Sequence, residues 1–114
     1  MIKIAHVREL ELICKLPAPV INVVEDVVTI LDNEYGESRD VDNDFGGYSL
    51  IIENESDLVQ LQEHRIDIKT AIFEYVDEIL CDDGQIYVSA LILQGSDNGI
   101  VLITPLEIFP RVSM

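Results

Sequence analysis

The sequence predicts a single α+β domain, residues 1–114, in which an antiparallel β meander packs against one longer and one short helix. The chain has 114 residues, 48 % of them hydrophobic, so one core forms without disulfides or metals. A helical period of apolar residues follows the first prolines, and three apolar segments separated by glycine-containing turns fill the last third. No internal repeat, low-complexity tract or linker divides the chain, which indicates one compact unit.

The amino-terminal segment, residues 2–15, mixes apolar and charged positions. Apolar and charged residues alternate imperfectly in it, and its β-branched content favours a strand. Pro17 and Pro19 follow, and proline is tolerated in the first turn of a helix because the N–H there has no helical partner. We therefore expect a strand within residues 2–15 and a helix directly after it.

Five apolar residues after these prolines have 3-4-3-4 spacing: Ile21, Val24, Val28, Leu31 and Tyr35. This spacing predicts an amphipathic helix over residues 19–35, with Gly36 as its carboxy-terminal stop. A second apolar set widens the stripe, so the helix is expected to lie deep in the core. Acidic residues occupy the remaining third of the wheel, among them Glu25, Asp26 and Asp32.

The middle of the chain predicts a loop, a strand and a short helix. Residues 36–47 are rich in Asp and Gly, as a loop is, and residues 48–53 form a short apolar run typical of a strand. Ser56 is the predicted N-cap and Asp57 lies in the first turn of a helix that ends near His64.

The last third predicts three antiparallel strands over residues 71–80, 85–94 and 100–104. Asp-Gly and Asn-Gly sequences in the two connections are typical of hairpins, so strand 85–94 is expected to be central. Consecutive apolar positions in residues 91–93 and 100–103 predict that both sheet faces are covered. Two helices cover one face. The other needs the amino-terminal segment, the carboxy-terminal tail or a second subunit, which favours a homodimer or a larger oligomer.

The charge balance excludes several kinds of partner. Seven Lys and Arg stand against 22 Asp and Glu, a net charge of −15, and the basic residues never cluster. Because phosphate contacts need clustered cations, nucleic acid is not an expected partner. No apolar run approaches the roughly 18 residues of a membrane span, and charges interrupt the amino terminus where a signal peptide is apolar. We expect no membrane contact and a cytoplasmic location.

Most of the excess negative charge lies in residues 25–63, which contain twelve acidic residues and one basic residue, Arg39. A concentrated acidic face attracts a basic protein and excludes acidic ones. The sequence thus favours a non-enzymatic module that binds a basic protein partner, and acidity for solubility alone is the competing explanation. The expected binding residues are Glu25, Asp26, Asp32, Asp40, Asp42, Asp44, Glu53, Glu55 and Asp57.

One local pattern favours an alternative function, calcium or small-ligand binding. Counted from Asp42, the segment Asp42–Glu53 resembles an EF-hand loop, with Asp44 at position three and the bidentate Glu53 at position twelve. The match is incomplete because position five is Gly46, which offers no side-chain ligand. We expect no resident metal.

The remaining reactive residue types form no recognisable catalytic motif. Cys14 and Cys81 are 67 positions apart without a neighbouring Cys or His, so a zinc site lacks its ligands, and partly buried free thiols are expected. No glycine-rich phosphate loop or nucleophile elbow occurs, so we assign no cofactor and no catalytic residue. Adjacent carboxylates, such as Asp77 and Glu78, are expected to be solvated surface charges, because neighbouring residues rarely face the same cleft. A small enzyme with a carboxylate site at a dimer cleft is the weakest alternative.

Overall fold

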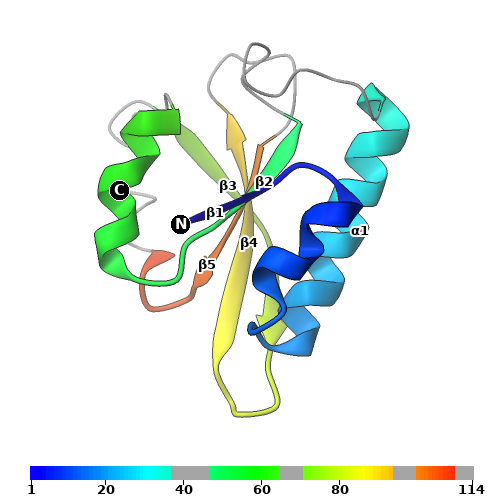
Figure 1. Cartoon of the computed structure of the whole chain (residues 1–114). Helices are drawn as coiled ribbons and strands as arrows, with labels where there is room; N and C mark the ends of the chain where they lie inside the picture. Colours follow the sequence, from blue (N-terminus) through cyan, green and yellow to red (C-terminus); the bar gives the residue numbers. More distant parts are fainter. Residues whose placement is uncertain (37–46, 65–70, 94–99, 110–114) are drawn as a thin grey trace.

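The computed structural model describes residues 1–36, 47–64, 71–93 and 100–109 (Figure 1). Its centre is a five-stranded mixed sheet with the strand order β1-β2-β5-β4-β3. Every neighbouring pair is antiparallel except β2 and β5, which are parallel. The strands are β1 (Ile2–Ile4), β2 (Tyr48–Ile51), β3 (Ile72–Leu80), β4 (Ile86–Leu93) and β5 (Ile100–Pro105). The predicted α+β class is confirmed.

The predicted meander is also confirmed, with β4 between β3 and β5. The tight turn between β3 and β4 is fixed by backbone hydrogen bonds from Gly84 N–H to Cys81 O and from Cys81 N–H to Gln85 O. Gly84 has a φ of +87°, which a residue without a Cβ adopts at little cost. The second connection, residues 94–99, lies outside the described residues.

In the part of the chain that the structure describes, three helices flank the sheet (Figure 1). Helix α1 (Ala18–Tyr35) agrees with the predicted helix 19–35, and it ends at Gly36, whose N–H donates to Asp32 O. The 3-10 helix η1 (Val7–Ile13) packs beside α1, and the 3-10 helix η2 (Glu55–His64) lies on the opposite side of the sheet. Within the described helices, none is long and apolar enough to cross a lipid bilayer.

The predicted strand over residues 2–15 is wrong beyond Ile4, because residues 7–13 form η1. The Glu9 carboxylate accepts hydrogen bonds from the backbone N–H groups of Ala5 and His6, at 3.1 and 3.0 Å, and Glu9 N–H donates to His6 O. These local bonds satisfy the orphan donors of the first turn, which outweighs a weak β-propensity.

The predicted N-cap at Ser56 is also wrong, since η2 begins one residue earlier, at Glu55. Asn54 precedes the helix, and its carbonyl accepts the N–H of Asp57 at 3.1 Å. The Ser56 hydroxyl donates instead to the Asn54 side chain. Asn offers a side-chain acceptor as Ser does, so a sequence with Asn54 and Ser56 two positions apart does not determine which one caps.

The sheet separates two hydrophobic clusters. On the η2 side, alternate residues of β2 and β5 pack with Leu61 of η2 and Ile108. On the α1 side, Ile51 and Ile103 pack with Ile13 of η1 and the valines of α1. Both faces of β2 and β5 are therefore covered by the same chain. This coverage removes the reason for expecting a homodimer, which stays a prediction without that support.

The central position of β2 predicts a large cost for Leu50→Ala, because Leu50 is fully buried. Removing a buried leucine side chain costs about 2–5 kcal/mol of unfolding free energy. Leu12→Ala is the matched control, since Leu12 is 58 % exposed, and it should cost less than about 0.5 kcal/mol. Urea denaturation of both variants measures the difference. Equal costs would contradict the position of β2 in the sheet.

Substitution of Ser49 is expected to stabilise the protein. Its hydroxyl is buried and has no hydrogen-bond partner among the described residues, and it therefore bears an uncompensated desolvation cost. Ser49→Ala removes this group and should raise the free energy of unfolding by about 1 kcal/mol. A rise in melting temperature checks this, and a fall of similar size would show that the hydroxyl has a partner after all.

Candidate functional site

The structure divides the predicted acidic residues into three groups. Asp40, Asp42 and Asp44 lie outside the described residues. Four carboxylates are exposed, two of them on α1 and two around the connection between β2 and η2: Glu25, Asp26, Glu53 and Glu55. The last two, Asp32 and Asp57, point inward and bind other parts of the chain.

Asp32 connects α1 to the amino-terminal segment. Its Oδ1 lies 3.1 Å from Nδ1 of His6, and the two side chains are only 11 % and 12 % exposed. His6 immediately precedes η1, so this contact joins the beginning of η1 to the last turns of α1. Asp32 therefore has a structural role inside the molecule and is a poor candidate for contacting a partner.

Asp57 binds the first residue of the chain and the segment that follows β2. Its Oδ2 accepts the backbone N–H of Glu53 at 2.9 Å, and its Oδ1 lies 2.9 Å from the α-ammonium of Met1. Burial by itself raises the pKa of Asp57, but these hydrogen bonds and the ammonium charge outweigh it and lower the pKa below the ordinary value of 3.8. Asp57 is thus ionised and internally paired at neutral pH.

No local signal in the sequence indicates either pairing. His6 is 26 positions from Asp32, and Met1 is still farther from Asp57, so only the folded chain brings them together. The contact of Asp57 with Glu53, in contrast, spans four residues and belongs to the short-range hydrogen bonds that Asp makes near helix starts.

The segment that resembles an EF-hand loop, residues 42–53, includes a strand of the sheet. Tyr48–Ile51 is strand β2, between β1 and β5, whereas an EF-hand loop passes directly into a helix at its twelfth residue. Glu53 is exposed, and its N–H donates to Asp57. The described residues hold no group of three or more His, Cys, Asp or Glu side chains arranged around a common point. Calcium binding stays a prediction, since Asp42 and Asp44 are not described.

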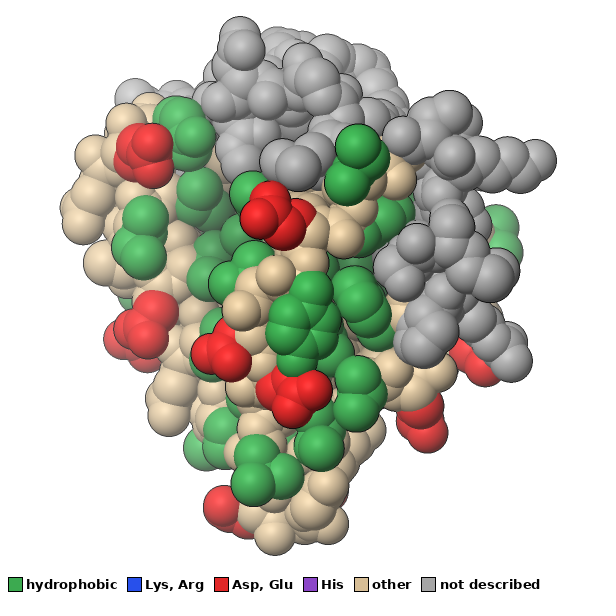
Figure 2. Space-filling model, turned by 180° about the vertical axis from the view of Figure 1, so that it is seen from behind, with side chains coloured by type: hydrophobic (Ala, Val, Ile, Leu, Met, Phe, Trp, Pro, Cys, Tyr) green, Lys and Arg blue, Asp and Glu red, His purple; other side chains and the backbone are tan. Residues whose placement is uncertain are grey.

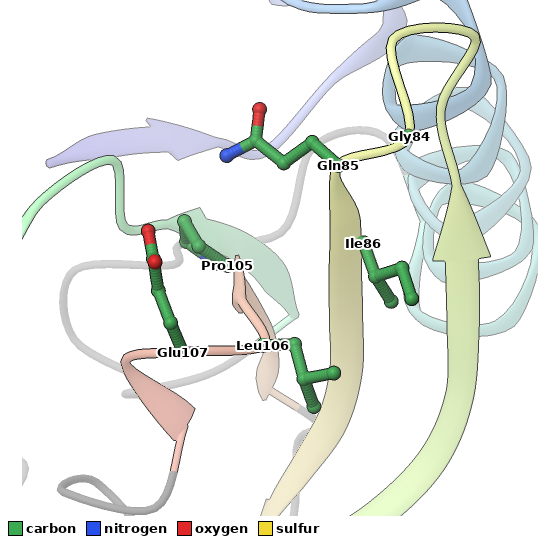
Figure 3. Close-up of a pocket in the computed structure, with 6 residues that line it drawn as sticks. All are labelled: Gly84, Gln85, Ile86, Pro105, Leu106 and Glu107. Atoms are coloured by element: carbon green, nitrogen blue, oxygen red, sulfur yellow. The ribbon is translucent and has the colours of Figure 1, made fainter.

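Two hollows of about 300 Å³ occur on the described surface. One lies between the start of β4 and the end of β5 (Figure 3), where Gln85 and Glu107 bring the polar groups and Ile86, Pro105 and Leu106 the apolar ones. Its lining contains no Ser, Thr, Cys, Lys or His, so it offers no nucleophile. Its volume is at the lower end of the range for small-molecule sites.

The second hollow is lined by η1, by the chain that follows it, and by Glu53. Its lining combines Cys14 and Lys15 with two carboxylates, Glu11 and Glu53. Cys14 is exposed, contrary to the expected partial burial, while Cys81 is buried. Burial, together with the negative charges of Asp83 and Asp82, raises the pKa of the Cys81 thiol, which makes it a poor nucleophile at neutral pH.

Strand β3 is a candidate surface that the sequence did not indicate. It is predicted and observed as a strand, yet four of the nine exposed large hydrophobic side chains of the described residues belong to it: Ile72, Tyr75, Val76 and Leu80. Figure 2 shows green side chains gathered between red ones on this side of the molecule. An edge position, which the composition of β3 does not reveal, exposes these residues.

The lowered pKa of Asp57 predicts a pH-dependent stability. A carboxyl whose pKa is lower in the folded than in the unfolded chain stabilises the fold above its unfolded pKa, and this contribution is lost as the pH falls through the folded pKa. We expect Asp57→Asn to cost about 1–3 kcal/mol at pH 7 and much less at pH 3. Asp26→Asn, on the exposed side of α1, should change neither value by more than about 0.5 kcal/mol. Urea denaturation of both variants at both pH values measures these changes in unfolding free energy. A cost of Asp57→Asn that is independent of pH would contradict the ion pair.

Comparison with known proteins adds no relative to this picture. No protein-family model matches the chain, and neither a curated protein nor a solved structure is significantly similar to it. The functional argument accordingly depends on the charge, exposure and geometry of the residues described above.

Proposed function

We propose that this protein is a non-enzymatic interaction module that binds a basic protein partner. The observation that carries the proposal is the concentration of unbalanced carboxylates in residues 25–63, where one basic residue accompanies twelve acidic ones. Glu25, Asp26, Glu53 and Glu55 have exposed side chains in the structure. Carboxylates placed in this way supply the negative potential that attracts a basic surface.

Two of the expected acidic residues are left out of the proposed binding face. Asp32 contacts the His6 imidazole and Asp57 pairs with the Met1 ammonium, so both carboxylates are engaged within the chain. The binding face proposed for residues 25–63 therefore consists of the four exposed carboxylates together with Asp40, Asp42 and Asp44. Such exposed charges act mainly on the association rate and on partner choice, and salt screens them over a Debye length of about 10 Å at 0.1 M.

A paired substitution on α1 tests the proposal. The partner is first cross-linked to the chain in host extract at low salt, identified by mass spectrometry, and then purified for affinity measurements. Glu25→Gln with Asp26→Asn should weaken its binding about threefold to tenfold at low salt, because two exposed charge pairs are lost. The difference should shrink as salt is added.

The control has the same change in charge outside residues 25–63. Asp82→Asn with Glu107→Gln removes two carboxylates from the β3–β4 turn and from the segment after β5, both exposed. This variant should bind within about twofold of the wild type, because distant exposed charges couple weakly. A captured partner that is acidic, or equal weakening by both variants, would overturn the role of residues 25–63.

A further inference from the structure

Strand β3 is one of the two edge strands of the sheet, at the end opposite to β1. It pairs with β4 on one side, and no described strand pairs with its other side. Seven of its nine residues are exposed, whereas β2 and β5 are almost wholly buried. Exposed fractions of 63 % for Ile72, 60 % for Val76 and 69 % for Leu80 are large for aliphatic side chains. An edge with this character is a template for pairing with another strand.

The exposed apolar residues of β3 are interspersed with carboxylates. Glu74, Asp77 and Glu78 are exposed on the same strand, and residues 71–93 contain five acidic residues and no Lys or Arg. Acidic side chains on an edge strand oppose pairing with any segment of the same charge. They favour a segment in which Lys or Arg alternates with apolar residues.

We propose that the outer edge of β3 is a docking surface for an extended, basic segment of the partner protein, which adds a strand to the sheet. The proposal rests on the basic partner of the proposed function and adds a second contact with it, outside residues 25–63. Backbone hydrogen bonds along the edge supply affinity, and side chains on both faces supply selectivity. Nine residues at about 3.4 Å each give an edge of about 30 Å, enough for a segment of about eight residues.

Charge excludes a second copy of this chain as the occupant. Pairing β3 with β3 brings the carboxylates of two strands together with no basic residue between them. Like charges opposite each other destabilise a strand pair, while a basic segment removes that repulsion. The carboxylates of β3 thus oppose pairing of β3 with β3 and leave this edge open to a basic strand.

The local structure of β3 limits the pairing at one point. A β-bulge between Tyr75 and Asp77 places Val76 without an opposing residue on β4, and Glu78 N–H donates to the Asp77 carboxylate at 2.8 Å. A partner carbonyl that approaches this N–H must displace the carboxylate, which is then released to pair with a cation of the segment. Bulges and side-chain contacts of this kind protect an edge until the correct partner arrives.

Tyr75 supplies the aromatic anchor of the surface. Its ring is 46 % exposed and meets Phe109 edge-on, with ring centroids 6.0 Å apart. Partial desolvation, a hydrogen bond with Glu78 and the charges of Glu78 and Asp77 raise the pKa of Tyr75 to about 12, so the phenol stays neutral throughout the physiological range. Tyrosine, with tryptophan and arginine, is enriched among the residues that dominate binding energy at interfaces.

The test uses an eight-residue peptide of alternating Lys and Val, titrated into the intact protein and followed through the backbone amide resonances. The amides of β3 should shift, and Val76→Lys should weaken binding at least about tenfold, because it adds repulsion and removes apolar contact. Val59→Lys, at a site 76 % exposed on η2, is the matched control and should bind within about twofold of the wild type. The same peptide with alternate N-methylated amides keeps its charge, loses its edge hydrogen bonds and should bind about tenfold more weakly.

The outcomes separate this inference from the proposed function. If Val76→Lys and Val59→Lys bind alike, if the N-methylated peptide binds as tightly, or if β3 amides do not shift up to millimolar peptide, docking at β3 is wrong. The test with Glu25 and Asp26 stands independently of these results. A wild-type dimer that Val76→Lys converts to a monomer in light scattering would also overturn the inference, because the edge would then be an interface between copies.

Discussion

The parallel pairing of β2 with β5 is the contact on which the rest of the structure depends. It places Tyr48–Ile51 beside Ile100–Ile103, with β1 on the outer side of β2 and β4 on the outer side of β5. Both strands are apolar on consecutive positions, so each face of the sheet centre must be covered. Helices α1 and η1 cover one face and η2 covers the other, which divides the core into two clusters.

The acidic composition serves the fold as well as the surface. Asp32 and Asp57 each bind a group from the first six residues of the chain, the His6 imidazole and the Met1 ammonium. These contacts hold β1 and η1 against α1 and η2, on opposite sides of the sheet. Residues 25–63 therefore contain two kinds of carboxylate: nearly buried ones that bind other parts of the chain, and exposed ones.

Strand β3 combines exposed aliphatic side chains with exposed carboxylates and an irregular backbone. An edge strand with aliphatic side chains exposed to water is a hazard for aggregation unless charges or irregular geometry protect it. Here both are present, in Glu74, Asp77 and Glu78 and in the bulge at Val76. In the proposed docking, the same carboxylates that repel a second copy attract a basic strand, so one set of residues provides both protection and selectivity.

The sequence alone determined the elements that depend on short-range patterns. Helix α1 follows from its 3-4 apolar spacing and Gly36, and the β3–β4 hairpin follows from the Asp-Gly turn. The prediction of a strand over residues 7–13 is wrong, because the Glu9 carboxylate accepts the N–H of His6 and this capping contact outweighs the β-propensity. The parallel β2–β5 pair, the partners of Asp32 and Asp57, and the exposure of β3 were decided only by tertiary structure. Ile72–Leu80 and Ile100–Pro105 are both apolar strands, and only the order of strands in the sheet makes one an edge and the other a centre.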